Sequence, residues 1–167
     1  MTAAHFRCST VSNGESDTRA LGQRIATRCR GGEVLLLIGD LGAGKTVFVQ
    51  GLAEGLGATG ITSPTFTLLH IHRDGRLPLV HADLYRLSGP AEVADLGIED
   101  VAVGAAVLAV EWPDRLGALA ADGRLEVRLM VASCDRREIR LCATDERHAA
   151  LLAGEPAAGG AEERPAS

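Results

Sequence analysis

The sequence predicts a three-layer α/β domain, in which helices flank a mixed sheet that combines a parallel core with antiparallel strands. Two short, continuously apolar runs, "EVLLLIG" (33–39) and "AAVLAVEW" (105–112), are typical of strands buried on both faces. A glycine-rich turn follows the first run and leads into a segment with apolar residues at every fourth position, which indicates a helix. Strand, glycine-rich turn, helix and further buried strands are together typical of an α/β domain.

The N-terminal part of the chain predicts one strand and two helices. Residues 7–11 suit a short strand, and residues 16–29 suit a helix that Ser16 caps. A second helix is expected to begin at about Gly44, after the glycine-rich turn. Each helix has an apolar face built from residues four positions apart: Leu21, Ile25 and Cys29 in the first, and Phe48, Leu52 and Leu56 in the second.

The middle of the chain predicts a hairpin followed by a broken helix. Residues 61–72 lead into a strand, residues 77–85 form the returning strand, and "RDGR" (73–76) turns between them. Its Asp-Gly pair favours a two-residue type I′ turn, in which both central residues have positive φ. The stretch 89–102 is helical, with a break expected at Gly97.

The C-terminal part predicts a closing antiparallel pair of strands and a last helix. Residues 123–133 and 137–143 alternate between apolar and polar side chains, as half-buried strands do. Residues 144–153 suit a short helix with Thr144 as its cap.

Length and composition favour one domain at residues 1–152 and a disordered tail at residues 153–167. A chain of 167 residues, 46% of them apolar, can bury about 70% of its unfolded surface and needs no disulfide or metal to fold. The stretch from Ala153 onward has no apolar periodicity, so we expect disorder there.

Charge and cysteine content exclude several classes of protein. The net charge is −5, which does not suit a protein that grips nucleic acid by itself, because that grip depends on clustered basic residues. The four cysteines form no CxxC pair and match no zinc spacing, so we expect reduced thiols in a cytoplasmic protein. The first ten residues lack the apolar core of a secretory signal, and the longest apolar run (101–110) is too short to span a membrane.

The glycine-rich turn is a phosphate-binding loop. "GDLGAGKT" (39–46) matches G-x-x-x-x-G-K-[ST] in full, with a strand before it and a helix after it. Its glycines allow backbone N–H groups to curl around phosphate oxygens, and the helix N-terminus adds partial positive charge. The hydroxyl of Thr46 suits Mg²⁺. The residues expected to contact the nucleotide here are Gly39, Asp40, Leu41, Gly42, Ala43, Gly44, Lys45, Thr46 and Val47.

Lys45 is the only lysine in a chain with 17 basic side chains. A compact ammonium on a flexible stem suits the β- and γ-phosphates, and the planar fork of arginine does not replace it equally well. The guanine-reading motif of GTPases, [NT]KxD, needs a second lysine, which this chain lacks. The sequence therefore predicts ATP rather than GTP, together with Mg²⁺.

P-loop proteins usually place an acidic residue at the end of a second buried strand, where it holds or orients the metal. Asp83 ends "LPLVHAD" and Glu111 ends "AVLAVE". The residues alone do not rank these two acids. Three histidines lie nearby, at positions 70, 72 and 81, and we expect ordinary solvent-facing or hydrogen-bonded side chains rather than a metal site.

Four segments in this order resemble one family. "GDLGAGKT", "SPTFTL", "HADLYRL" and "VEWPDRL" are similar to the motifs of the TsaE (YjeE) family, the bacterial P-loop ATPases of tRNA threonylcarbamoyladenosine synthesis. The resemblance extends from about Ser16 to Ala143. The phosphate loop is shared by many families, whereas the other three segments make the resemblance specific.

The resemblance implies roles for individual residues. The family's metal ligands fall on Thr46 and Glu111, and Asp83 becomes a second acid facing the γ-phosphate. Thr65 lies in what resembles the family's switch loop, and Arg137 matches an arginine that lines the nucleotide pocket. The segment from Glu15 to Thr18 is expected near the base, and Trp112 near the nucleotide or a partner surface. The implied catalytic residues are Lys45, Asp83 and Glu111.

Two positions depart from the family pattern. Val47 replaces a frequent second threonine, which removes one hydroxyl from the nucleotide site, and Asp114 replaces a frequent glutamate. The resemblance implies slow ATP hydrolysis in support of a TsaB–TsaD pair, which itself transfers the threonylcarbamoyl group, so that tRNA is met only through that partner. Two alternatives remain open at this point: a small-molecule kinase, and a nucleotide-gated binding module without significant turnover.

Overall fold

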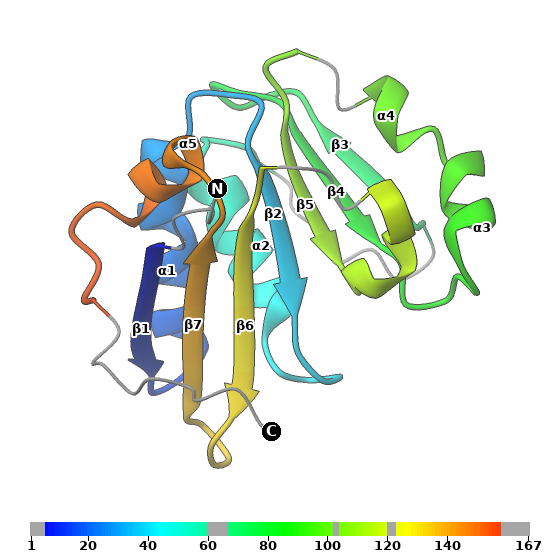
Figure 1. Cartoon of the computed structure of the whole chain (residues 1–167). Coiled ribbons are helices and arrows are strands. Elements are labelled where there is room, and N and C mark those ends of the chain that lie inside the picture. The colour runs from blue at the N-terminus through cyan, green and yellow to red at the C-terminus, as the bar shows by residue number, and fades with distance from the viewer. Residues whose placement is uncertain (1–5, 60–66, 102–103, 120–122, 158–167) are drawn as a thin grey trace.

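The computed structural model describes residues 6–59, 67–101, 104–119 and 123–157 (Figure 1). Its sheet has seven strands in the order β1-β7-β6-β2-β5-β4-β3. The strands are β1 (Phe6–Ser12), β2 (Val34–Ile38), β3 (Leu69–His72), β4 (Leu79–Asp83), β5 (Val107–Glu111), β6 (Leu125–Val131) and β7 (Arg137–Ala143). The helices are α1 (Glu15–Arg28), α2 (Lys45–Gly55), α3 (Pro90–Asp95), α4 (Ile98–Val101) and α5 (Glu146–Ala149), with 3₁₀ turns η1 (Pro113–Leu119) and η2 (Ala150–Leu152).

The sheet is mixed, as the sequence predicts. Strand β2 pairs in parallel with both β5 and β6, and β4 pairs in parallel with β5. The pairs β1–β7, β6–β7 and β3–β4 are antiparallel. Because β2, β4 and β5 run in one direction, their carboxyl ends meet at one edge of the sheet, where ligands bind in open α/β sheets.

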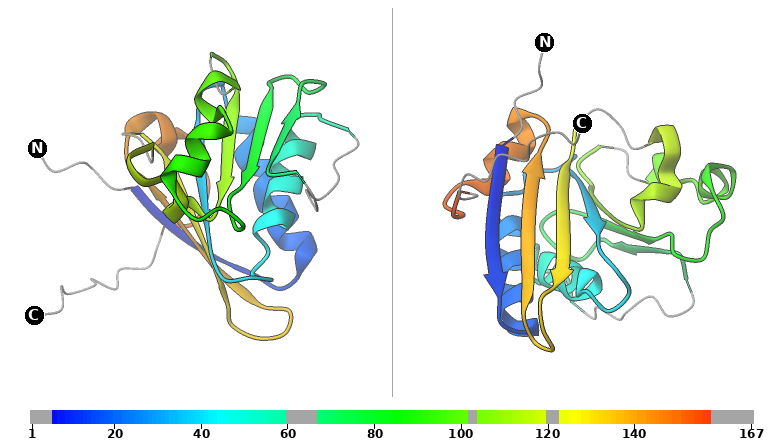
Figure 2. Two further views of the ribbon diagram at one scale, coloured as in Figure 1. Left: turned by 90° about the vertical axis from the view of Figure 1, so that its right-hand side faces the viewer. Right: turned by 60° about the horizontal axis from the view of Figure 1, so that its bottom comes forward.

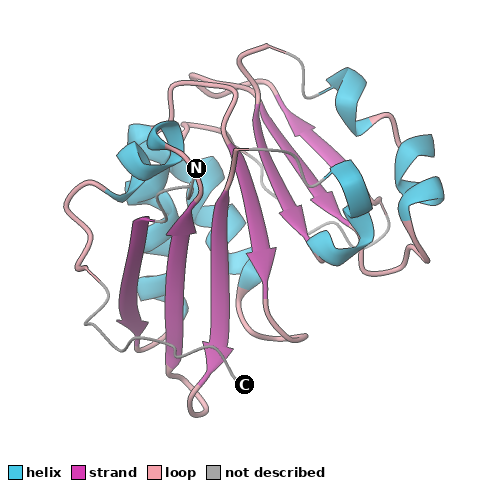
Figure 3. Cartoon of the chain, viewed as in Figure 1, coloured by secondary structure: helices cyan, strands magenta, loops and turns pink. Residues whose placement is uncertain are grey.

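Helices lie on both faces of the sheet (Figures 2 and 3). On one face, α1 and α2 cover a core that includes Ile25, Phe48 and Leu52. On the other face, α3, α4 and η1 pack over β2, β5 and β4, around residues such as Leu36 and Val110. Among the described residues, no helix covers this second face at β1, β7 and β6 (Figure 1). The predicted three-layer architecture is confirmed, and its third layer is partial.

Two glycines allow α1 and α2 to approach closely. A Cβ added to Gly51 would lie 2.0 Å from the carbonyl oxygen of Arg19, and one added to Gly22 would lie 2.3 Å from the carbonyl oxygen of Phe48. Both distances are shorter than any contact that a real Cβ makes, so the two backbones are too close together for a side chain at either position. This packing fixes α2, which begins at the phosphate loop, against α1.

Two predicted helix caps were wrong. Gly14 occupies the N-cap of α1, and Ser16 lies inside the helix. Asp145, rather than Thr144, caps α5 by accepting a hydrogen bond from the backbone N–H of His148. Both helices start where the backbone leaves the extended conformation. In α1 this point lies two residues before the predicted cap, and in α5 it lies one residue after it.

The β3–β4 hairpin has a longer loop than a type I′ turn. His72 pairs with Leu79, so the loop covers residues 73–78. Neither Asp74 nor Gly75 has positive φ. The Asp74 carboxylate instead accepts hydrogen bonds from the backbone N–H and the hydroxyl of Thr59, which ties the loop to the end of α2.

The first part of the expected tail is ordered. The buried carboxylate of Glu155 accepts hydrogen bonds from Arg24 and Arg28 of α1. The backbone N–H of Ser9 donates to the carbonyl of Pro156, and Cys8 forms an isolated bridge with Ala157. Residues 153–157 are therefore held against β1 and α1, because ion pairs from two partly exposed arginines to Glu155 replace the missing apolar periodicity. Residues 158–167 lie outside the described residues.

Candidate functional site

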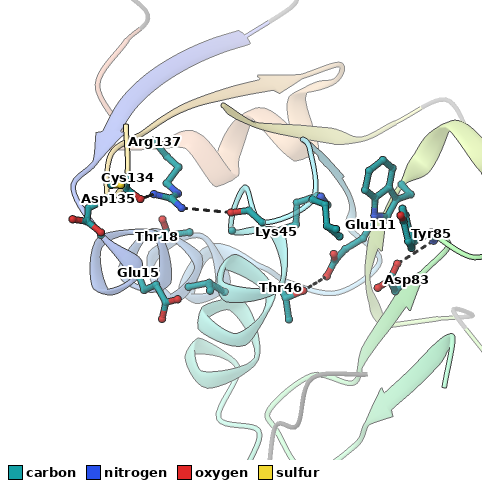
Figure 4. Close-up of a pocket in the computed structure, with 16 residues that line it drawn as sticks. Glu15, Thr18, Lys45, Thr46, Asp83, Tyr85, Glu111, Cys134, Asp135 and Arg137 are labelled. Atoms are coloured by element: carbon teal, nitrogen blue, oxygen red, sulfur yellow. Dashed lines mark hydrogen bonds between the residues drawn. The ribbon is translucent and has the colours of Figure 1, made fainter. Parts of the chain in front are cut away.

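A pocket of about 450 Å³ lies at the carboxyl end of β2 (Figure 4). Its walls come from the phosphate loop, the start of α1, the ends of β4 and β5, and the hairpin between β6 and β7. The predicted residues that line it are Glu15, Thr18, Leu41, Gly42, Gly44, Lys45, Thr46, Val47, Asp83, Glu111 and Arg137. Gly39, Asp40 and Ala43 belong to the same loop but do not line the pocket, and Thr65 lies outside the described residues.

The phosphate loop has the backbone that its glycines permit. Gly42 has φ 79° and Gly44 has φ 104°, which are left-handed conformations that disfavour side chains. A Cβ on Gly39 would lie 2.6 Å from the carbonyl oxygen of Leu129 in β6. The first glycine therefore allows close approach to the sheet, and the next two allow the loop to curl ahead of α2.

Lys45 is buried, with 4% of its surface exposed. Its Nζ donates to the carbonyl oxygens of Gly39 and Asp40, at 2.6 and 2.9 Å. Burial lowers the pKa of Lys45, and the nearby carboxylates, chiefly that of Glu111, partly offset this effect. The loop thus holds one ammonium group against two of its own backbone carbonyls, which are neutral partners that a phosphate can replace.

Thr46 and Glu111 come together at the pocket floor. The Thr46 hydroxyl donates to Oε1 of Glu111 at 3.0 Å (Figure 4). Glu111 is 3% exposed, and His81 Nε2 lies 2.9 Å from the same Oε1. The sequence predicts an ordinary solvent-facing or hydrogen-bonded side chain at His81, and no spacing rule signals its contact with an acid 30 residues away.

Asp83 lies beside Glu111 without sharing its contacts. The two residues are register partners on the parallel strands β4 and β5. The Asp83 carboxylate accepts a hydrogen bond from the backbone N–H of Tyr85 at 3.1 Å. Two acids thus stand at one edge of the sheet, and Glu111 is the one in contact with the loop threonine.

Trp112 follows Glu111 with an uncommon backbone. Its φ is 59°, and among the described residues it is the only non-glycine residue with positive φ. Its ring lies 4.4 Å from Lys45 Nζ and 4.9 Å from the ring of Tyr85. Left-handed backbone at a bulky residue is uncommon, and such residues gather at functional sites.

The far end of the pocket lies between α1 and the β6–β7 hairpin. Arg137 donates to the carbonyl oxygens of Cys134 and Gly42, at 2.8 and 3.4 Å, which links the hairpin to the phosphate loop (Figure 4). Cys134 and Asp135 also line the pocket, as does Gly14. Gly14, Cys134 and Asp135 could not be predicted as pocket residues, because a helix cap and a hairpin tip carry no sequence motif.

The residues present fit a phosphate ligand with a divalent cation. Positive-φ glycines, a helix N-terminus and a buried ammonium suit phosphate, and the Thr46 hydroxyl and Glu111 carboxylate are the oxygen donors that Mg²⁺ prefers. In the described part of the chain, no group of three or more His, Cys, Asp or Glu residues can hold a metal by itself. Mg²⁺ typically takes one or two protein ligands and completes its shell with phosphates and water.

Comparison with known proteins places this chain in a family. The family model described as "Threonylcarbamoyl adenosine biosynthesis protein TsaE" matches residues 12–139. A relative from Bacillus subtilis, named tRNA threonylcarbamoyladenosine biosynthesis protein TsaE, is 42% identical over 81% of this chain and 85% of its own length. A relative of the same name from Treponema pallidum is 40% identical over 80% of this chain and 98% of its own length.

A solved structure agrees with these relatives. The crystal structure of Bacillus subtilis YdiB superposes with a TM-score of 0.76 and 35% identity, and the match covers 90% of this chain and 94% of that one. Among the described residues, no helix has the length and apolar character needed to cross a membrane. With its motifs, its fold and its similarity over most of its length, the chain belongs to the TsaE family.

Proposed function

We propose that this protein is a Mg²⁺-dependent ATPase that supports the formation of threonylcarbamoyladenosine in tRNA. Its TsaE relatives are named for that biosynthesis, and the phosphate loop supplies the reason to choose ATP binding. The observation that carries the proposal is the contact between Thr46 and Glu111, beside the buried Lys45. These three groups are a hydroxyl, a carboxylate and an ammonium, and they are the set that MgATP needs.

Each group has a distinct part in the proposed reaction. Backbone N–H groups of the loop and the ammonium of Lys45 bind phosphate oxygens, and Lys45 stabilises the charge that develops on them. Thr46 and Glu111 would hold Mg²⁺, which supplies charge neutralisation at the phosphates. Asp83, next to Glu111 on the sheet edge, orients the attacking water and accepts its proton. The protein contributes position and charge rather than a covalent intermediate.

The transfer of the threonylcarbamoyl group lies with a partner in this proposal. The chain has a net charge of −5, which does not suit a protein that grips tRNA by itself, so tRNA is reached through a TsaB–TsaD pair in the cytoplasm. Tyr85 is 49% exposed and stacks near Trp112 at the pocket wall. It therefore offers the partner an apolar contact that adjoins the nucleotide.

The test is complementation in a bacterium depleted of its own TsaE. Threonylcarbamoyladenosine is measured by mass spectrometry of digested tRNA, with the wild-type chain and Lys45→Ala in parallel. Restoration by the wild type alone supports the proposal. If soluble wild type fails even with its cognate TsaB and TsaD, the tRNA role is wrong. Phosphate release from ATP without any acceptor separates an ATPase from a small-molecule kinase, and its absence under all conditions favours a nucleotide-gated binding module.

A further inference from the structure

His81 is buried at the centre of β4 and has one strong polar contact. It is 3% exposed, and its Nε2 lies 2.9 Å from Oε1 of Glu111, which is equally buried. An ionised carboxylate can only accept hydrogen bonds, so Nε2 carries the proton and donates. A buried polar pair of this kind is retained only when both members are satisfied.

The contact falls on one particular oxygen of Glu111. Oε1 accepts from His81 on the sheet side and from the Thr46 hydroxyl on the α2 side. Among the described residues, no hydrogen bond reaches Oε2. The carboxylate is therefore anchored through one oxygen, and the other oxygen is left as an acceptor in a residue that lines the pocket.

His81 does not line the pocket itself. It stands behind Glu111, two residues before Asp83 on the same strand and therefore on the same face of the sheet. Side chains in this relation to a metal ligand fix its orientation, and their loss typically weakens metal affinity about 10- to 100-fold.

We propose that His81 is a positioning residue, which holds Oε1 of Glu111 so that the carboxylate presents its free oxygen to the divalent cation of MgATP. The part of this proposal that involves the cation rests on the proposed function. The hydrogen bond between His81 and Glu111 does not depend on it, because that bond belongs to the protein alone. The two can therefore be tested separately.

The first experiment examines the protein without nucleotide. Ring-¹⁵N NMR identifies the His81 signals by their loss in His81→Gln, and we expect Nε2 to be protonated and its shift to move in Glu111→Gln. An unprotonated Nε2, or a signal that Glu111→Gln leaves unchanged, overturns the proposal whatever the protein binds.

The second experiment titrates Mg²⁺ in the presence of a non-hydrolysable ATP analogue and follows Trp112 fluorescence. His81→Leu removes the donor, whereas His81→Gln keeps an N–H at a similar distance. We expect His81→Leu to weaken the apparent Mg²⁺ affinity about 10- to 100-fold, with little change in analogue affinity in EDTA, and His81→Gln to retain most of the wild-type affinity. His70→Gln is the matched control, because His70 is the register partner of His81 on β3 and contacts Thr67 rather than Glu111.

Two results contradict the positioning role. One is wild-type Mg²⁺ affinity in a folded His81→Leu protein. The other is an equal loss in His81→Leu and His81→Gln with an equal fall in melting temperature, which assigns His81 to stability alone. A wild-type protein that binds no analogue refutes the proposed ATP site instead, and the NMR experiment then still decides whether His81 holds Glu111.

Discussion

The ammonium group of Lys45 lies 4.4 Å from the centroid of the Trp112 ring. An aromatic face at this distance attracts a cation by about 0.5–2 kcal/mol. Trp112 reaches this place because its backbone is left-handed directly after β5, with φ 59°. The same ammonium is the group that phosphate oxygens need. Under the proposed function, nucleotide binding would therefore change the surroundings of Lys45, and we expect the ring beside it to report this change.

Trp112 is the only tryptophan in the chain and it lines the pocket, so all tryptophan emission comes from the pocket wall. We expect an ATP analogue to change the intensity or wavelength of that emission, because phosphate alters the cation beside the ring. A fluorescence titration measures the effect, and Lys45→Ala is the control that removes the cation. Unchanged emission in wild-type protein that demonstrably binds the analogue would count against a link between ring and lysine.

Replacement of Lys45 tests the phosphate loop. We expect Lys45→Ala to lose at least about 100- to 1000-fold in ATP turnover, because one charged donor to the transition state disappears. Lys45→Arg should recover little, since a larger, planar guanidinium does not replace the compact ammonium that the carbonyls of Gly39 and Asp40 hold. Phosphate release measures both variants, and circular dichroism checks that they fold. Near-normal turnover in Lys45→Ala contradicts the site.

The two strand-end acids should have different effects. The Glu111 carboxylate accepts a hydrogen bond from the Thr46 hydroxyl, whereas the Asp83 carboxylate accepts one from the backbone N–H of Tyr85. We therefore expect Glu111→Ala to weaken Mg²⁺-dependent binding of an ATP analogue more than Asp83→Ala does, and Asp83→Ala to act mainly on turnover. Mg²⁺ titration of each variant gives the order, and the reverse order exchanges the two roles.

Gly51→Ala tests the close packing of α1 and α2. Alanine gains about 1 kcal/mol over glycine in a helix interior, but its Cβ would stand 2.0 Å from the backbone carbonyl of Arg19. Because backbone cannot rotate away, we expect a net loss of about 1–3 kcal/mol in the free energy of unfolding. Urea denaturation measures it. Gly89→Ala is the control, since nothing lies within 4 Å of its added Cβ; equal effects in both variants would deny the steric explanation.

Glu155→Gln tests the ordered C-terminal segment. The hydrogen bond from Arg24, with further contributions from Arg28, lowers the pKa of Glu155. A lowered pKa in the folded state means stability that is present at neutral pH and is lost as the pH falls through that lowered pKa. We expect the variant to be about 1–3 kcal/mol less stable at pH 7. Urea denaturation at several pH values should show the difference shrinking below the ordinary pKa of glutamate, and a pH-independent difference would exclude the charge as its source.

Strands and helices with a regular apolar pattern could be predicted from the sequence. Strands β2 and β5 are continuously apolar, and α2 has Phe48, Leu52 and Leu56 on one face, so local pattern and burial agree. Helix starts and loops were less predictable. The 73–78 loop takes its shape from the contact between Asp74 and Thr59, a tertiary interaction that outweighs the local preference of Asp-Gly.

In the candidate site, too, residues fixed by a local motif were predictable and residues placed by tertiary contacts were not. Lys45 and Thr46 were predictable because a motif fixes their spacing. The residues alone left Asp83 and Glu111 unranked, and only the family resemblance favoured Glu111. Two pocket residues, Cys134 and Asp135, come from a hairpin tip that reaches the phosphate loop through Arg137. Such contacts depend on how two distant segments meet, and no local pattern records them.

The position of Lys45 has a practical consequence for chemical labelling. It is the only side-chain amine in the sequence and is buried, so amine-directed dyes and biotin esters would react first at the chain's α-amino group, and a label that reached Lys45 would occupy the pocket. Thiol reagents would also modify the pocket, because the exposed Cys134 lies on the pocket wall. Of the other thiols, Cys8 and Cys29 are buried and Cys142 is half-buried. A new cysteine on the helix-free face of β1, β7 and β6, in a Cys134→Ser background, offers an attachment point that leaves the pocket untouched.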